Sequence, residues 1–101
     1  MPMIELSRLK LESPNIVIRP LRADSDFVRT EKKYDRHGFG EVLAVSENTG
    51  WRTAPINVGD LVIYDDTHSI EFPVVVEKDA LPEIVECVHA SEVYGLQKAS
   101  K

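Results

Sequence analysis

Cysteine is almost absent from this chain of 101 residues, which carries only Cys87. A single cysteine excludes an intramolecular disulfide, a CxxC redox pair and a zinc site built from clustered Cys and His. Such sparing use of cysteine is typical of a reducing compartment. We therefore expect a cytoplasmic protein.

Long apolar runs and an excess of positive charge are also lacking. No stretch approaches the roughly 20 apolar residues that span a bilayer, and the N-terminus has no apolar core of a signal peptide. The chain has 12 Lys and Arg against 17 Asp and Glu, a net charge of −5. Its most basic stretch, residues 29–36, is interrupted by Glu31 and Asp35, as is common in a solvated loop. We expect neither nucleic acid nor a membrane as a partner.

What the chain does have is the composition of one small globular domain, with 43 % hydrophobic and 29 % charged residues. From Asn15 onward the apolar residues fall into short β-branched runs separated by Pro, Gly, Asn and Asp. This pattern predicts an all-β domain over residues 15–101, with strands at residues 16–18, 41–45, 61–64, 72–76, 84–89 and 92–96. Strands this short suit a small barrel.

Two connectors have the chemistry of tight turns. Residues 47–50 offer Asn48 and Gly50 for positive φ, and residues 65–67 offer Asp and Thr side chains that bond their own backbone. We expect a hairpin tip at each.

Residues 1–14 stand apart as an N-terminal arm. Ile4, Leu6, Leu9 and Leu11 lie on a polar background before Ser-Pro-Asn. The alternation predicts an edge strand or β-arm, and the spacing of Leu6 and Leu9 also matches the face of a helical turn, which remains the alternative.

Residue types that carry chemistry are scattered. The three histidines, His37, His68 and His89, share no metal-ligand spacing with a carboxylate or cysteine. Three carboxylates, Asp65, Asp66 and Glu71, offer oxygen atoms but lack the spacing and glycine of an EF-hand loop.

Cys87 is the remaining candidate for chemistry. It lies in an apolar alternation typical of a buried thiol, and His89 two residues on has no evident third group to orient it. The sequence therefore predicts no catalytic residue, no metal, no cofactor and no enzymatic activity.

Three segments in order resemble the GroES-type co-chaperonins. They are Ile-Arg-Pro-Leu at residues 18–21, Gly-Glu-Val-Leu-Ala-Val at residues 40–45 and Val-Gly-Asp-Leu-Val-Ile-Tyr at residues 58–64. The resemblance covers roughly residues 16–97. It implies a small GroES-like, partly open β-barrel with a short roof hairpin at residues 47–55, and Trp51 near its tip. Trp51 then either contacts a neighbouring roof or a partner, or folds back onto the barrel.

Three residues within these segments have structural roles that do not depend on the resemblance. Gly40 and Gly59 give backbone freedom where a strand starts sharply from a loop. Asp60 can accept hydrogen bonds from nearby turn amides as the chain enters the next strand.

The resemblance also implies assembly. Family members form a homo-oligomeric ring that caps a chaperonin large subunit, and the first strand of one subunit pairs with the last strand of the next. Such pairing also covers two exposed sheet edges. The inter-subunit residues implied here are Ile16, Val17, Ile18, Val93, Tyr94 and Leu96.

The main difference between this chain and the family lies in the docking loop. Here residues 29–39 are shorter and lack its hydrophobic Ile-Val-Leu-type motif. Tyr34 and Phe39 are candidates to replace this motif in docking, because aromatic side chains are frequent hot spots of protein interfaces. The alternative for Phe39 is that it covers the end of the barrel. Ile4 and Leu6 on the arm offer a second candidate by strand addition, or else form an edge strand that thickens the subunit contact.

We expect a non-catalytic, co-chaperonin-like ring subunit that assists protein folding. The alternative is a structural or assembly protein, for example a virion component, that reuses the barrel without binding a chaperonin. In a viral protein, the expected location is the host cytoplasm.

Overall fold

The computed structural model describes residues 3–21, 37–47, 50–51 and 54–99. Its elements are, in chain order, η1 (Leu6–Arg8), β1 (Asn15–Pro20), β2 (His37–Val45), β3 (Gly50–Trp51), β4 (Ala54–Pro55), β5 (Leu61–Asp65), β6 (Ile70–Val74), β7 (Glu83–His89), η3 (Ala90–Glu92) and β8 (Val93–Gln97). Both η elements are single turns of 3-10 helix. Within these ranges, no helix is long and apolar enough to cross a membrane.

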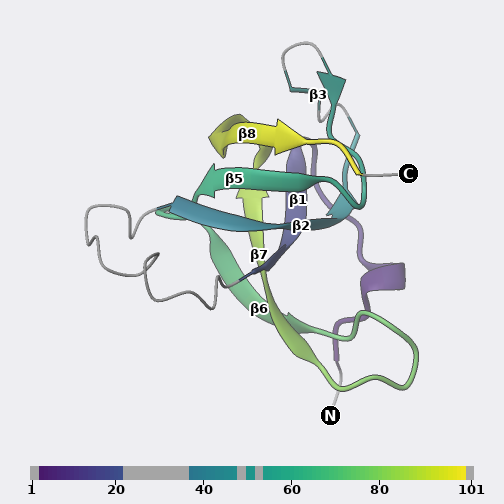
Figure 1. Cartoon of the computed structure of the whole chain (residues 1–101). Coiled ribbons are helices and arrows are strands. Elements are labelled where there is room, and N and C mark those ends of the chain that lie inside the picture. Colours follow the sequence, from purple (N-terminus) through teal and green to yellow (C-terminus); the bar gives the residue numbers. More distant parts are fainter. Residues whose placement is uncertain (1–2, 22–36, 48–49, 52–53, 100–101) are drawn as a thin grey trace.

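The strands form an all-β structure, as the sequence predicts. Each of the six predicted strands is present, and all six belong to one antiparallel sheet in the order β6-β7-β1-β2-β5-β8 (Figure 1). β3 and β4 form a separate two-stranded ribbon, in which Gly50 pairs with Pro55 and Trp51 with Ala54. The ribbon falls within residues 47–55, for which the resemblance implies a roof hairpin.

The sheet is curled, and its main core fills the concave side. β5 and β7 are separated in the sheet by β1 and β2, yet Tyr64 of β5 and Val88 of β7 belong to the same buried cluster. Only a curled sheet brings them together. The core comprises apolar residues at most 5 % exposed, namely Ile16, Ile18, Val42, Ile56, Val62, Tyr64, Val88, Ala90 and Val93.

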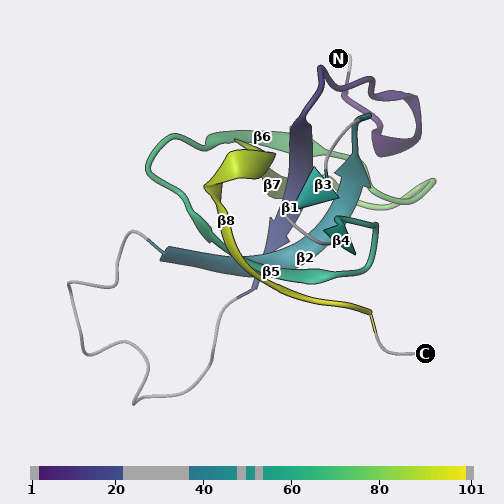
Figure 2. The same ribbon diagram turned by 90° about the horizontal axis from the view of Figure 1, so that it is seen from above.

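A second apolar cluster lies on the opposite side of the sheet and packs against the N-terminal arm. Figure 2 shows the course of the arm beside the sheet. Val17, Val74 and Val85 are buried there, and three arm residues pack against them, Leu6, Leu9 and Leu11. Backbone hydrogen bonds hold the arm in place, from Leu6 N to Val75 O (2.9 Å) and from Val75 N to Ile4 O (2.8 Å). The arm therefore combines both alternatives, with one parallel bridge from Glu5 to Val75 and then the η1 turn.

The turn at residues 65–67 has the predicted chemistry but joins different strands from those expected. Asp65 Oδ1 accepts a hydrogen bond from Thr67 N at 2.9 Å, as its side chain predicts. However, β5 pairs with β2 and β8, and β6 pairs with β7. The prediction of a hairpin tip is wrong here, because the turn connects two strands that do not pair. Asn48 and Thr49, at the centre of the other predicted tip, lie outside the described residues.

Gly40 is required for a different reason from the one the sequence suggests. It lies inside β2, opposite Pro20, and not at the start of a strand. A Cβ atom at this position would lie 2.5 Å from Arg19 O and would also collide with the Ile18 side chain. Glycine is needed there for close packing of β1 against β2. Gly59, in contrast, has the predicted left-handed conformation, with φ of 96°.

Candidate functional site

The most distinctive surface feature is a row of exposed apolar side chains on the outer face of the curled sheet. Val62 and Tyr64 point into the core, so the alternation of side chains along β5 turns Ile63 outward, where it is 48 % exposed. Ile63 pairs directly with Phe39 of β2, which is 43 % exposed. Directly opposite residues on one face contact each other and act as a unit.

The row extends to the end of β1. Leu21 N donates a hydrogen bond to Phe39 O at 2.8 Å, which continues the β1–β2 pairing by one residue. Leu21 is also exposed. Three strands thus place Leu21, Phe39 and Ile63 side by side on the outer face.

A groove of about 300 Å³ runs beside this row and reaches β8, the last strand of the sheet. Gly95 pairs with Ile63 and has no side chain, so the outer face is hollow at that point. We call this feature the outer-face groove; it is lined by Phe39, Leu61, Val62, Ile63, Gly95, Leu96 and Gln97. Its lining is mainly apolar, as expected of a surface that contacts another protein.

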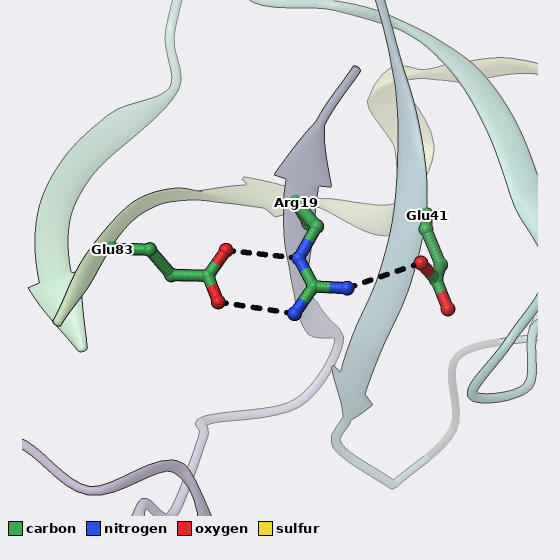
Figure 3. A network of polar contacts seen from close by, with 3 residues as sticks. All are labelled: Arg19, Glu41 and Glu83. Atoms are coloured by element: carbon green, nitrogen blue, oxygen red, sulfur yellow. Dashed lines mark hydrogen bonds and ion pairs between the residues drawn. The ribbon is translucent and has the colours of Figure 1, made fainter. Parts of the chain in front are cut away.

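An ion-pair network borders the row on the β1 side (Figure 3). Arg19 donates two hydrogen bonds to Glu83, from Nε to Oε1 (2.9 Å) and from Nη2 to Oε2 (3.0 Å), and a third from Nη1 to Glu41 Oε1 (3.3 Å). The bond from Arg19 lowers the pKa of Glu83 below its usual range, although partial burial opposes the shift. The network ties β7, β1 and β2 together beside the groove.

A buried carboxylate fixes the far end of the groove. Asp60 is 1 % exposed; its Oδ2 accepts hydrogen bonds from Lys98 Nζ and Asn57 N, and its Oδ1 accepts one from Ala99 N, all at 2.9 Å. Burial alone would raise the pKa of Asp60, but the bonds from Lys98, Asn57 and Ala99 outweigh it and hold the pKa below the ordinary value. Asp60 thereby anchors the chain after β8 to the turn before β5, beyond the turn contacts that the sequence predicts.

The predicted docking residues separate in the structure. Tyr34 lies outside the described residues. Phe39 lies on the outer face and lines the groove, so it does not simply cover the end of the sheet. On the arm, Leu6 is half-buried against the second apolar cluster, whereas Ile4 is 43 % exposed. Of the three that the structure describes, only Phe39 lines the outer-face groove.

The predicted inter-subunit strands also differ from expectation. Ile16, Val17 and Ile18 are fully buried, and β1 pairs with β2 on one side and with β7 on the other. This part of the prediction is corrected, because β1 has no free edge for a neighbouring subunit in this structure.

β8, in contrast, is one of the two terminal strands of the described sheet. Val93 is buried in the core and Leu96 is half-buried against it. Tyr94 is exposed, and its hydroxyl donates a hydrogen bond to Asp65 Oδ2 at 3.3 Å.

The candidates for chemistry remain apart. Within the described ranges, no three His, Cys, Asp or Glu side chains are grouped so as to hold a metal ion. Cys87 is half-buried, and burial raises the pKa of its thiol, which disfavours the reactive thiolate. His89 Nδ1 accepts a hydrogen bond from Ser91 N at 3.1 Å and so caps η3.

Several residues of this surface were not predicted. Ile63, Leu61 and Gly95 were treated only as parts of strands, although the alternation in residues 61–64 marks one side of β5 as outward. The ion pair of Lys98 with Asp60 joins residues 38 positions apart, so no local sequence signal could predict it.

Comparisons with models of known protein families, with curated proteins and with solved structures found no match for the chain.

Proposed function

We propose that this chain is a non-catalytic, co-chaperonin-like ring subunit, and that its outer-face groove receives part of a neighbouring copy. The observation that carries the proposal is the directly paired, exposed Phe39 and Ile63, which form one wall of an apolar groove that reaches the terminal strand β8. An apolar surface assembled from three strands is unusual on a monomer and typical of a protein contact.

The neighbouring copy is the proposed occupant because of where the groove lies. Its lining includes Gly95, Leu96 and Gln97 of the last strand, which is the strand that the resemblance to GroES-type proteins assigns to the subunit contact. Two of the three segments that resemble GroES-type proteins lie on β2 and β5. These strands pair with each other and carry Phe39 and Ile63, which form the wall opposite β8. Ring closure then needs a partner for β8 other than β1.

The capping of a chaperonin belongs to the same proposal and rests on the resemblance. Because Leu6 packs on its own sheet, the docking residues that remain are Ile4 on the arm, and Tyr34 in the segment outside the described residues. The second candidate function is a structural assembly protein that keeps subunit contacts without chaperonin docking. The arm favours this candidate, since it stabilises its own subunit through Leu6, Leu9 and Leu11.

Capture by a chaperonin in the presence of ATP tests the first function against the second. Immobilised chaperonin should retain the protein saturably with ATP and release it without nucleotide. A Phe39→Ser/Ile63→Ser double variant should lose both self-assembly and capture, because a ring docks through many subunits at once. Ile70→Ser is the matched control, since Ile70 is 66 % exposed and lies outside the groove. Assembly without any capture would reject the co-chaperonin function and leave the structural one.

A further inference from the structure

One acidic side chain in the core has no role in the proposed assembly. Glu86 is 7 % exposed and lies in the middle of β7, directly opposite Ile18 of β1 and Glu71 of β6. Since opposite residues share a face, its side chain lies on the same side of the sheet as Ile18, in the concave core. A glutamate is almost never buried this far unless it is paired.

The carboxyl group of Glu86 is not fully satisfied. The hydroxyl groups of Tyr64 and Ser69 lie close to it, and that of Ser69 donates its hydrogen bond to Asp66 O at 3.1 Å. The Glu86 oxygen Oε1 is buried and has no hydrogen-bond partner within the described ranges. A buried oxygen without a partner is costly when it carries charge and much less so when the carboxyl group is neutral.

The charged groups around Glu86 also favour its neutral form. Burial is the largest influence and raises its pKa, and the carboxylates of Asp66 and Glu71 raise it further, while the nearby hydroxyl groups of Tyr64 and Ser69 oppose the shift. From β1, the apolar Ile18 faces it. From β5, Tyr64 faces it, and burial likewise raises the pKa of that phenol, which keeps it a neutral hydrogen-bond donor.

We propose that Glu86 is a proton-linked latch for β6: with Glu86 neutral, β6 and the turn at residues 66–69 close over the core, and with Glu86 ionised they open locally. The moving element is β6 because, among the described residues, this terminal strand pairs with β7 alone, and because two of the groups that repel an ionised Glu86, Asp66 and Glu71, lie on this turn and strand. Opening gives the carboxylate access to water. The latch does not depend on the proposed assembly.

The direction of the pH dependence follows from the two states. An exposed glutamate loses its proton near pH 4.3, whereas the buried one keeps it to higher pH. Between these two pKa values the closed state holds one more proton than the open state, so raising the pH by one unit favours opening about tenfold. Below about pH 4 the closed state is favoured fully, and above the pKa of the closed state the effect levels off.

Hydrogen exchange at the amides of Ile70, Phe72 and Val74 tests the latch, with rates corrected for the intrinsic effect of pH. Wild-type protection in β6 should fall by about tenfold per pH unit within the window, while the amides of Val17 and Ile18 in β1 keep theirs. Glu86→Gln should remove the pH dependence. Glu71→Gln is the matched control: it keeps the buried acid, so the dependence should remain and move to lower pH.

Two results would overturn the latch. One is the same pH profile in the wild-type protein and in Glu86→Gln. The other does not require the variant to fold: a ¹³C NMR titration of the wild-type protein in which the Glu86 carboxyl carbon titrates in the ordinary glutamate range. Neither result bears on subunit assembly, which is measured separately by mass.

Discussion

The ring of Tyr64 in β5 lies directly against Gly38, its pairing partner in β2, on the concave side of the sheet. This close approach depends on glycine at position 38. A Cβ atom on Gly38 of β2 would lie 2.5 Å from Tyr64 Cζ and 2.9 Å from its hydroxyl oxygen. Glycine at this position makes the room that the Tyr64 ring occupies.

Gly40→Ala should destabilise the protein by about 1–3 kcal/mol, because the new methyl group meets the backbone oxygen of Arg19, which cannot move without separating β1 from β2. Urea unfolding measures the loss. Gly95→Ala is the matched control in another strand, since its nearest contact would be Ile63 Cδ1 at an ordinary 3.4 Å. Equal losses in the two variants would show that close packing at Gly40 is not the cause.

Asp60→Asn should cost about 1–3 kcal/mol at pH 7, since an amide cannot accept all the hydrogen bonds that reach the two oxygens from Asn57, Lys98 and Ala99. Asp79→Asn is the control: this residue is exposed, and its φ of 65° suits asparagine as well as aspartate. A loss no larger than that of the control would contradict the anchoring role of Asp60.

The lowered pKa of Asp60 also predicts that the folded protein loses stability in acid. Its pKa is lowered in the folded state, so its contribution is complete above the unfolded value of about 3.9 and disappears as the pH falls through the lower folded value. Unfolding free energies measured from pH 5 down to pH 2 should therefore fall less steeply for Asp60→Asn than for the wild-type protein. Parallel curves would mean that Asp60 has the same pKa in both states.

Glu83→Gln, in contrast, should cost less than about 1 kcal/mol, although Arg19 holds Glu83 by two hydrogen bonds. The side chains of Arg19 and Glu83 are 32 % and 37 % exposed, so water and salt screen their attraction. The difference from wild type should shrink further in high salt. A loss as large as that of Asp60→Asn, independent of salt, would show that this pair acts as a buried one.

The six strands could be predicted because each carries a local signal, namely a short β-branched run between turn residues. The arrangement of the strands could not. Nothing local in residues 65–69 distinguishes a hairpin tip from a link between two strands that do not pair. The resemblance implies a free edge at Ile16 to Ile18, whereas long-range pairing places that strand inside the sheet.

The candidate surface was predictable only in part. Phe39 was singled out as an aromatic residue beside a loop, but its pairing with Ile63 depends on the register between β2 and β5. Glu86 was missed because a charged residue inside an apolar run is ordinarily assigned to the solvent side. Here the alternation in β7 places it in the core, and the cost of burying it appears as an oxygen without a partner.

The mass of the free protein in solution tests the central claim, that the outer-face groove mediates assembly, most directly. Native mass spectrometry, supported by light scattering at micromolar concentration, should give a defined multiple of the 11.4 kDa chain for the wild-type protein and for Ile70→Ser. The folded Phe39→Ser/Ile63→Ser variant should give the mass of one chain. A wild-type protein found only at 11.4 kDa, or a double variant that assembles as the wild type does, would contradict the claim.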